Sequence, residues 1–499
     1  SDLAQAKAPL PPGQRCEARL LGAKALGGDG KRKEAIAELA ALAKDCDFDE
    51  DLAARGLYLA GKYSIGIGDN LGATALLARL EQLAPHHRLA DDARYLAASA
   101  YLDAGLEARF TELLSTIGRD YPEGDMSVDG LMLLAMRRFE KRDLPGAGVV
   151  LEEAVRLVGD ADGARGPEWA GRERYFLARV QCETGQKEVG LQSLAELFKR
   201  YPMSYYSLNA FTRLQADDPF HASKLLQESA EERDSTPFAV TWQPEFDSPG
   251  FRRALLLLKL GERDAGLQEI EQLGLARSGA APAVMWGLAM LYEEAGMPHL
   301  ANRFLSGSLR EWFSHWPTGS WQRAWRLAFP RPFHAQVEKA AADSQIPESL
   351  VYAIMREESG FDSGAESPAM AYGLMQLIVP TAKTYARKLG LGYSPSALKQ
   401  PTTSIRLGAT LLGELSRRFA PDEVLAIPAY NAGAGRPSQW EKQRPDVDFD
   451  VWVELIPYRE TRRYTKRVLA SRAAYRWLYE TPGAAALTLP LRLTPPVSK

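Results

Sequence analysis

An aromatic residue, a glycine and a proline recur at fixed spacing along the first two thirds of the chain. Ten positions separate the aromatic residue from the glycine, and seventeen more separate the glycine from the proline. The complete sets are Tyr58, Gly68 and Pro85; Tyr95, Gly105 and Pro122; and Tyr175, Gly185 and Pro202. The ten-residue half returns as Phe251 with Gly261 and as Trp286 with Gly296. This spacing predicts pairs of helices, with the aromatic side chain on the first helix, glycine in the turn, and proline ending the second.

Residues 14–320, which contain these sets, are rich in Ala, Leu, Arg and Glu and have helical periodicity with few strand signals. The first two sets start 37 residues apart, close to the period of about 34 of tetratricopeptide (TPR) repeats. Such helix pairs cannot bury their apolar faces alone, so we expect them to stack into a mainly α, TPR-like superhelical domain. The solenoid is either a binding surface for a long ligand or a plain scaffold.

Length and charge limit the broad class of protein. A chain of 499 residues with 45% hydrophobic and 25% charged residues is typical of a folded protein of two to four domains. The net charge of −3 argues against a nucleic-acid binder. Residues 331–499 carry 22 basic and 17 acidic residues, a mild excess that suits an anionic polymer. The sequence has no run of about 18 apolar residues, so we expect no membrane-spanning helix.

Two of the three cysteines flank an expected helical hairpin. Cys16 and Cys46 lie on either side of the turn GGDG at 27–30, and antiparallel helices would bring these two ends together. A disulfide is therefore geometrically reasonable, and two buried thiols are the equal alternative. Cys182 has no obvious partner in the sequence.

Proline-rich segments mark the expected domain boundaries. FPRPF at 329–333 has two prolines within three residues, which breaks helix continuity and places a boundary near residue 328. We predict a superhelical domain at 1–240, a helical linker domain at 241–328 that continues the solenoid, a further domain at 329–483, and an extended tail at 484–499. In that tail, leucines alternate with polar or turn residues, which favours packing along another domain over a mobile end.

A candidate acid lies at the end of a predicted helix after the boundary. In IPESLVYAIMREE (346–358), the residues Leu350, Val351, Ile354 and Met355 form one apolar stripe. Glu358 falls near the centre of that stripe, whereas Glu357 lies at its margin. Apolar surroundings would raise the pKa of Glu358, as a general acid requires near neutral pH. The alternative is a helix-end glutamate that extends to water.

Three further segments could bring polar groups close to a ligand. SGFDSGAESPAMAYG (359–373) is rich in small and turn-forming residues, GLMQ (373–376) supplies an amide, and AIPAYNAGAG (426–435) supplies a tyrosine and an asparagine beside small residues. Each segment alone is weak evidence for a site. Their occurrence together and in this order is specific.

The motifs REES, SPAMAYGLMQ, AYNAGAGR and IPYRETRRYTKRV, in this order, resemble those of the family-1 soluble lytic transglycosylases that cut bacterial peptidoglycan. The resemblance covers residues 329–480 and extends more weakly to 185–214. A goose-type lysozyme would share the Glu-Ser start, but not the full series of GLMQ, AYNAG and ETR together. The resemblance implies a superhelical domain, either an open solenoid or a closed ring, followed by a lysozyme-like catalytic domain.

The resemblance also implies site residues. Glu358, before the serine of the Glu-Ser motif, corresponds to the catalytic acid and base. The substrate-binding residues that it implies are Ser367, Met375, Gln376, Tyr430, Asn431 and Glu460. One departure is the pair Met370-Ala371, where the family usually has Gly-Ala; a bulky methionine there could narrow the cleft.

An ordinary glycosidase needs two carboxylates, but the resemblance implies a single-carboxylate reaction. Glu358 would protonate the bond between N-acetylmuramic acid and N-acetylglucosamine, and then deprotonate the muramyl C6 hydroxyl, giving a 1,6-anhydro product. The competing hypotheses are a hydrolytic muramidase that uses Asp362 or Glu366 as base, and a non-enzymatic scaffold. No metal or cofactor is expected.

Peptidoglycan as substrate implies the periplasm of a Gram-negative bacterium. The partner classes that fit are peptidoglycan glycan strands and cell-wall synthases, although no residue identifies a synthase. We expect a monomer that binds no nucleic acid.

Overall fold

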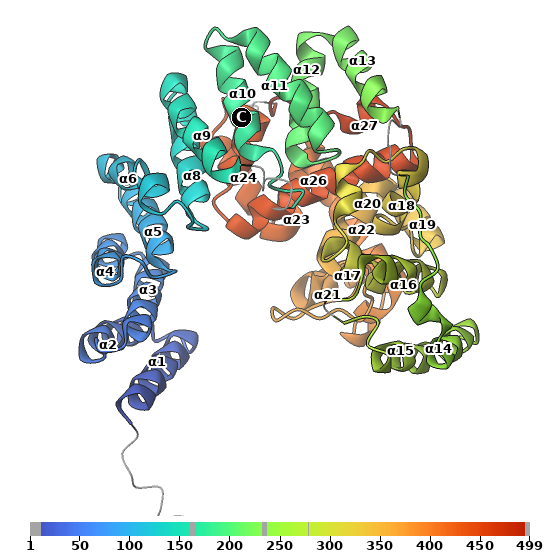
Figure 1. Ribbon diagram of the computed structural model, residues 1–499, viewed down its shortest axis with the longest axis horizontal. Helices are drawn as coiled ribbons and strands as arrows, with labels where there is room; N and C mark the ends of the chain where they lie inside the picture. Colours follow the sequence, from blue (N-terminus) through green and yellow to red (C-terminus); the bar gives the residue numbers. More distant parts are fainter. Residues whose placement is uncertain (1–10, 160–165, 232–236, 278, 495–499) are drawn as a thin grey trace, which may run out of the picture. The chain divides into compact units, whose positions relative to one another are not determined.

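The computed structural model describes residues 11–159, 166–231, 237–277 and 279–494 (Figure 1). The chain forms two compact units. The first comprises Ser1–Asp160 with Arg179–Gly185, and the second comprises Ala161–Ala178 with Gln186–Lys499. Both units are helical, and the strands of the described residues are one short antiparallel pair in the second unit. The prediction of a mainly α protein is therefore confirmed.

Successive helices of the first unit pack against one another. They are α1 (Pro12–Gly28), α2 (Arg32–Asp45), α3 (Glu50–Gly66), α4 (Asn70–Leu83), α5 (Ala90–Asp103), α6 (Glu107–Leu114), α7 (Ile117–Asp120), α8 (Ser127–Glu140) and α9 (Leu144–Val158). Aspartates begin several of them: the Asp49 carboxylate accepts from the Leu52 N–H (3.1 Å) at α3, and Asp69 accepts from the Gly72 N–H (2.9 Å) at α4. Such caps satisfy backbone donors that the helix itself leaves unpaired. Fully buried leucines and alanines fill the spaces between helices.

The glycines of the sequence repeat lie in the turns between paired helices. Gly68 has φ +82° between α3 and α4, and Gly261 has φ +83° between α14 (Pro249–Lys259) and α15 (Arg263–Gln272). A side chain with a Cβ rarely adopts this conformation, which explains why glycine recurs there. The predicted helix pairs are confirmed. In the second set, however, the second helix is divided into α6 and α7.

Cys16 and Cys46 form a disulfide, with their Cα atoms 6.2 Å apart. It joins the start of α1 to the residue after α2. Of the two alternatives left open by the sequence, the structure therefore contains the disulfide.

The second unit begins with helices that continue the repeat and ends with a group of helices that includes the short hairpin. The first group is α10 (Arg172–Glu183, shared with the first unit), α11 (Lys187–Arg200), α12 (Tyr205–Asp217), α13 (Pro219–Ala230), η3 (Pro244–Asp247), α14, α15, α16 (Pro282–Glu294), α17 (Pro298–Ser306), η4 (Glu311–Ser314), η5 (Gly319–Trp321) and α18 (Gln322–Ala328). The second group is α19 (His334–Ser344), α20 (Glu348–Ser359), β1 (Ala371–Tyr372), β2 (Leu377–Ile378), α21 (Val379–Lys388), η6 (Ser396–Lys399), α22 (Pro401–Arg418), η7 (Glu423–Leu425), α23 (Ala426–Ala432), α24 (Gly435–Gln443), α25 (Phe449–Glu454), α26 (Arg459–Tyr479) and α27 (Ala484–Leu487). Helix α26 is the centre of this group, packing against α20, α23 and α25.

A buried polar cluster fixes α12 to α26. The ammonium of Lys466, which is fully buried, donates to the Tyr206 hydroxyl (2.6 Å) and pairs with the Glu454 carboxylate (2.5 Å). Removing one partner of such a buried pair would leave an uncompensated charge, so the cluster specifies how these helices meet.

The segment after α26 packs back onto the second unit. The Leu489 N–H donates to the Thr212 hydroxyl (2.9 Å), and the Phe449 N–H donates to the Leu491 carbonyl (2.8 Å). Arg492 pairs with Asp448 (2.9 Å). The tail therefore packs on the second unit through residue 494, whereas the prediction that it is extended from residue 484 is wrong at its start, because Ala484–Leu487 form helix α27. Residues 495–499 lie outside the described residues. The domain boundaries at 240, 328 and 483 lie within the second unit and stay predictions.

No helix in the described part of the chain is both long and apolar enough to cross a membrane.

Candidate active site

Glu358 lies near the end of helix α20. Leu350, Val351, Ile354 and Met355 are at most 1% exposed, as the predicted apolar stripe requires. Gly360, with φ +57°, ends the helix two residues after Glu358, and its N–H donates to the Arg356 carbonyl (3.0 Å). This glycine is the left-handed cap that many helices use. The candidate acid therefore lies in the last turn, where the chain leaves the core.

The environment of Glu358 raises the pKa of its carboxyl to about 7. Burial is the main cause, because a low-dielectric environment disfavours the charged form. The Tyr464 hydroxyl and the charge of Arg467 act in the opposite direction, while the charges of Glu357 and Glu460 raise the pKa further. The prediction that apolar surroundings raise this pKa is confirmed. Glu358 can therefore both donate and accept a proton near neutral pH.

Two tyrosines lie beside Glu358. Tyr430, at the end of α23, donates its hydroxyl to the Met375 carbonyl (2.8 Å). Burial and then the charge of Glu358 raise the pKa of both Tyr430 and Tyr464 well above the usual value. The Tyr464 hydroxyl is buried and has no hydrogen bond of standard geometry within the described part of the chain, yet it lies close enough to lower the pKa of Glu358.

Sequence reasoning did not identify Tyr464. It lies one helical turn after Glu460 on α26, in the RETRRYTKR run, and it is only 3% exposed. The sequence signal that could have identified Tyr464 is an aromatic residue within an otherwise strongly charged helical segment, because such a residue generally faces the interior.

The loop after α20 is held by hydrogen bonds from its own side chains. Ser359 donates to the Leu374 carbonyl (2.9 Å), which ties the end of the helix to the GLMQ segment. The Gln376 amide donates to the carbonyls of Gly373 (2.9 Å) and Ala365 (3.2 Å). A Cβ at Gly373 would lie 1.9 Å from the Leu398 carbonyl oxygen, so only glycine fits there. Gln376 is thus fixed by the loop, with its carbonyl oxygen left as an acceptor.

Ser367 and Met370 form the tip of this loop. The Ser367 hydroxyl accepts from the Ala371 N–H (3.1 Å), and the Ser367 carbonyl accepts from the Met370 N–H (2.9 Å). Met370 has φ +59° and is 57% exposed. The Met370 side chain is therefore exposed, and it fills no buried space in the site.

The other predicted substrate-binding residues differ in their exposure. The Asn431 side-chain oxygen accepts from the Thr461 hydroxyl (2.6 Å), which connects α23 to the start of α26. Glu460 is exposed in the first turn of α26, and its charge reaches Glu358. Met375 is fully buried against Gly408, so its side chain is part of the core.

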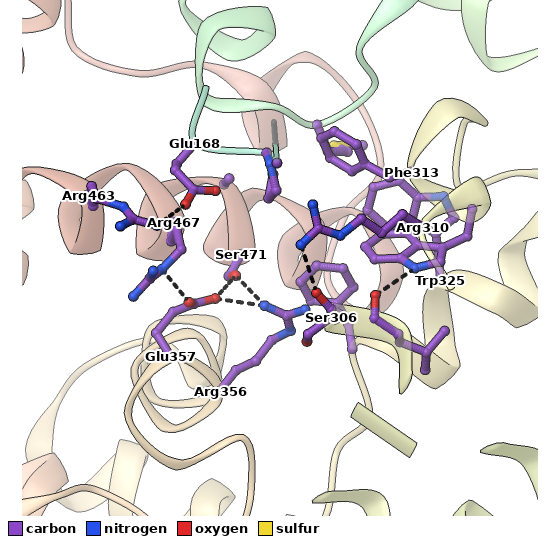
Figure 2. A pocket seen from close by; sticks show the side chains of 17 residues that line it. Glu168, Ser306, Arg310, Phe313, Trp325, Arg356, Glu357, Arg463, Arg467 and Ser471 are labelled. Atoms are coloured by element: carbon purple, nitrogen blue, oxygen red, sulfur yellow. Dashed lines mark hydrogen bonds and ion pairs between the residues drawn. The ribbon is translucent and has the colours of Figure 1, made fainter. Parts of the chain in front are cut away.

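The neighbouring glutamate, Glu357, forms ion pairs that hold the structure together. Its carboxylate receives hydrogen bonds from Arg356 (2.7 Å) and the Ser471 hydroxyl (2.8 Å) and pairs with Arg467 (2.9 Å), as Figure 2 shows. Its side chain is only 8% exposed. The sequence correctly placed Glu357 away from the centre of the apolar stripe. It did not predict that this side chain would be buried.

The two carboxylates considered as alternative bases have other partners. Asp362 accepts from the Gly364 N–H (2.8 Å) and so closes a local turn. Glu366 pairs with Lys399 (3.2 Å). Both contacts give these side chains a role in the loop.

Among the described residues, one group of carboxylates is close enough together to hold a metal ion. Its members are Asp91, Asp92 and Asp125, whose oxygens lie within 4.8 Å of one another. Asp91 accepts from the Met126 N–H (2.8 Å), which is a structural role. This group belongs to the first unit, not to the unit that contains Glu358.

Comparisons with known proteins agree with this geometry. Residues 335–453 match the family described as Transglycosylase SLT domain. A soluble lytic murein transglycosylase of Escherichia coli is 36% identical over 152 residues, which are 30% of this chain and 24% of that protein. A putative soluble lytic murein transglycosylase of Haemophilus influenzae is 35% identical over 153 residues, 30% and 26% of the two chains. The aligned sequence thus spans about a quarter of the length of these curated relatives.

The similarity in fold extends further than the similarity in sequence. The crystal structure of the 70 kDa soluble lytic transglycosylase of Escherichia coli aligns with a TM-score of 0.65 at 20% identity, over 98% of this chain and 76% of that one. The chain therefore carries a transglycosylase SLT domain and has the fold predicted from its sequence, that of a soluble lytic transglycosylase, with a superhelical region followed by a lysozyme-like domain.

Proposed function

We propose that this protein is a peptidoglycan lytic transglycosylase that cleaves the β-1,4 bond between N-acetylmuramic acid and N-acetylglucosamine without adding water. The observation that carries the proposal is Glu358, a carboxyl with a pKa of about 7 beside two buried tyrosines, in an SLT domain. Near neutral pH its protonated form is well populated, and after donation the carboxylate remains as a base.

The proposed reaction needs only one carboxylate from the protein. Glu358 protonates the glycosidic oxygen as the bond from muramyl C1 breaks, and the substrate's acetamido oxygen stabilises the developing positive charge. The Glu358 carboxylate then removes the proton from the muramyl C6 hydroxyl, whose oxygen bonds to C1 and forms the 1,6-anhydro ring. The pairing of Glu357 with Arg356 and Arg467 supports this scheme, because both carboxylate oxygens of that neighbour already have partners.

Around Glu358, we assign Ser367, Gln376 and Glu460 to binding the sugar or its peptide. Tyr430 and Asn431 flank the acid and the acetamido group. Met375 serves through its carbonyl, which orients the Tyr430 hydroxyl (2.8 Å).

A periplasmic location follows from the substrate. The Cys16–Cys46 disulfide supports it, because disulfides persist in oxidising compartments. Peptidoglycan glycan strands are the proposed binding partner. Binding to cell-wall synthases and a monomeric state are further proposals.

The test compares two adjacent substitutions on purified sacculi. Glu358→Gln should retain glycan binding and lose cleavage. Glutamine has nearly the same shape as glutamate, but its amide is neither a general acid nor a general base near neutral pH. Glu357→Gln is the matched control and should retain most activity. Near-normal turnover by the Glu358 variant would refute the assignment.

Product analysis tests the reaction type separately. Mass spectrometry of the released fragments should show anhydro ends, which lack one water relative to reducing ends. Reducing ends as the main product would instead identify a hydrolytic muramidase with a second carboxylate as base.

A further inference from the structure

A cavity lies beside the end of α20 and is lined by Arg356 and Glu357 but not by Glu358. It has a volume of about 400 Å³ and is lined by the loop before α10, the end of α17, η4, α18, α20 and α26. Figure 2 shows Glu357, Arg356 and Arg467 on one side and Phe313 and Trp325 on the other. Sites for small molecules generally have volumes of roughly 300–1,000 Å³, so the cavity is large enough for one.

One wall of the cavity is a rigid aromatic cluster. Trp312 and Trp325 meet edge to face at 4.6 Å between ring centres, and Trp325 stacks with Phe329 at 5.5 Å. The Trp312 and Trp325 indole N–H groups donate to backbone carbonyls, at 3.2 and 2.8 Å, so the rings are fixed. With Phe313 they form an apolar surface that exists before any ligand binds.

The facing wall is basic. Arg356, Arg463 and Arg467 line it together with two carboxylates, Glu168 and Glu357. Glu357 pairs with Arg356 and Arg467, and Glu168 pairs with Arg463 (3.0 Å). Three guanidinium groups therefore face two carboxylates, and Arg310 adds a further guanidinium at the rim. A pocket of this composition favours an anionic group beside an apolar one.

The guanidinium of Arg463 has spare donor capacity. Its Nε atom is buried and has no hydrogen-bond partner among the residues that the structure describes. Arg463 and Arg467 are separated by one turn of α26, so both side chains reach the same face of the helix. A buried donor without a partner is costly, and a carboxylate accepts such N–H groups with favourable geometry.

We propose that this cavity is a binding site for a small organic carboxylate, with the anionic group on Arg463 and Arg467 and an apolar body on the tryptophan wall. The site is separate from the proposed sugar-binding residues, and it does not depend on the proposed function. The Glu357 carboxylate lines the cavity and is adjacent in sequence to Glu358. A ligand that competes for Arg467 would therefore act next to the candidate acid.

Calorimetric titration of the full chain with 3-phenylpropionate tests the proposal. This probe has one carboxylate and one ring, whereas 3-phenylpropionamide lacks the charge and acetate lacks the ring. We expect one molecule of 3-phenylpropionate to bind per chain, and each truncated probe to bind at least about tenfold more weakly. Absence of binding by 3-phenylpropionate at millimolar concentration, or equal binding of the neutral amide, would overturn the proposal.

Substitutions locate the binding in this cavity. Arg463→Met should weaken binding about tenfold, whereas Arg476→Met, on the same helix but outside the cavity, should leave it unchanged. Ala470→Leu places a larger side chain on the cavity wall without changing charge, and it should also weaken binding at least about tenfold. Circular dichroism checks that each variant is folded. Undiminished binding by folded Ala470→Leu protein would overturn the assignment, even if the arginine variant does not fold.

Discussion

The raised pKa of Glu358 predicts that the candidate acid destabilises the folded protein. The pKa of Glu358 is about 7 in the folded chain, compared with 4.5 for an ordinary glutamate. Below pH 4.5 the carboxyl is neutral in both the folded and the unfolded state, so folding stability is unaffected. Stability then falls as the pH rises through this range, because the unfolded chain ionises first, and the full penalty is present above about pH 7.

The size of the penalty follows from the difference in pKa. One pKa unit corresponds to about 1.36 kcal/mol, so a difference of about 2.5 gives about 3 kcal/mol above pH 7. Glu358→Gln removes the ionisable group. We therefore expect the variant to be more stable than the parent by about 3 kcal/mol at pH 8 and nearly equal to it at pH 4.

Differential scanning calorimetry of both proteins at pH 4 and pH 8 measures this effect, with the transition of the unit that contains α20 followed in each. Glu357→Gln is the control, because its carboxylate is stabilised by Arg356 and Arg467. That variant should unfold at a lower temperature at pH 8, since it weakens a buried pair. A destabilised Glu358→Gln protein, or a stabilisation of the same size at both pH values, would refute the reasoning.

Three other predictions follow from the same region. The rate of sacculus cleavage should fall as the pH rises through about 7, because the first step requires protonated Glu358; a flat profile between pH 5 and 9 would contradict this. Tyr464→Phe removes a hydroxyl that lowers the pKa of Glu358, so the falling limb of that profile should move to higher pH, as a pH–rate series would show. Gly373→Ala should destabilise the protein by about 3 kcal/mol in denaturant titrations, because its Cβ would meet the Leu398 carbonyl at 1.9 Å and φ is +72°.

The sequence was sufficient for features that repeat or act over a few residues. The aromatic–glycine–proline spacing predicted the helix pairs, because helix length and turn conformation depend on neighbouring residues. The period of about 3.6 residues in α20 placed Glu358 on the buried stripe and separated it from Glu357. The order of short motifs then identified the lysozyme-like region.

Features that depend on distant residues required the tertiary structure. Ser471 and Arg467 reach Glu357 from α26, more than a hundred residues along the chain, and turn an apparently marginal glutamate into a buried ion pair. Tyr464 comes beside Glu358 only because α20 and α26 pack together. Local periodicity shows which face of a helix is buried, but not which helix covers that face. The sequence by itself therefore determined which residue is the candidate acid, whereas the packing of α26 decided which groups control its proton.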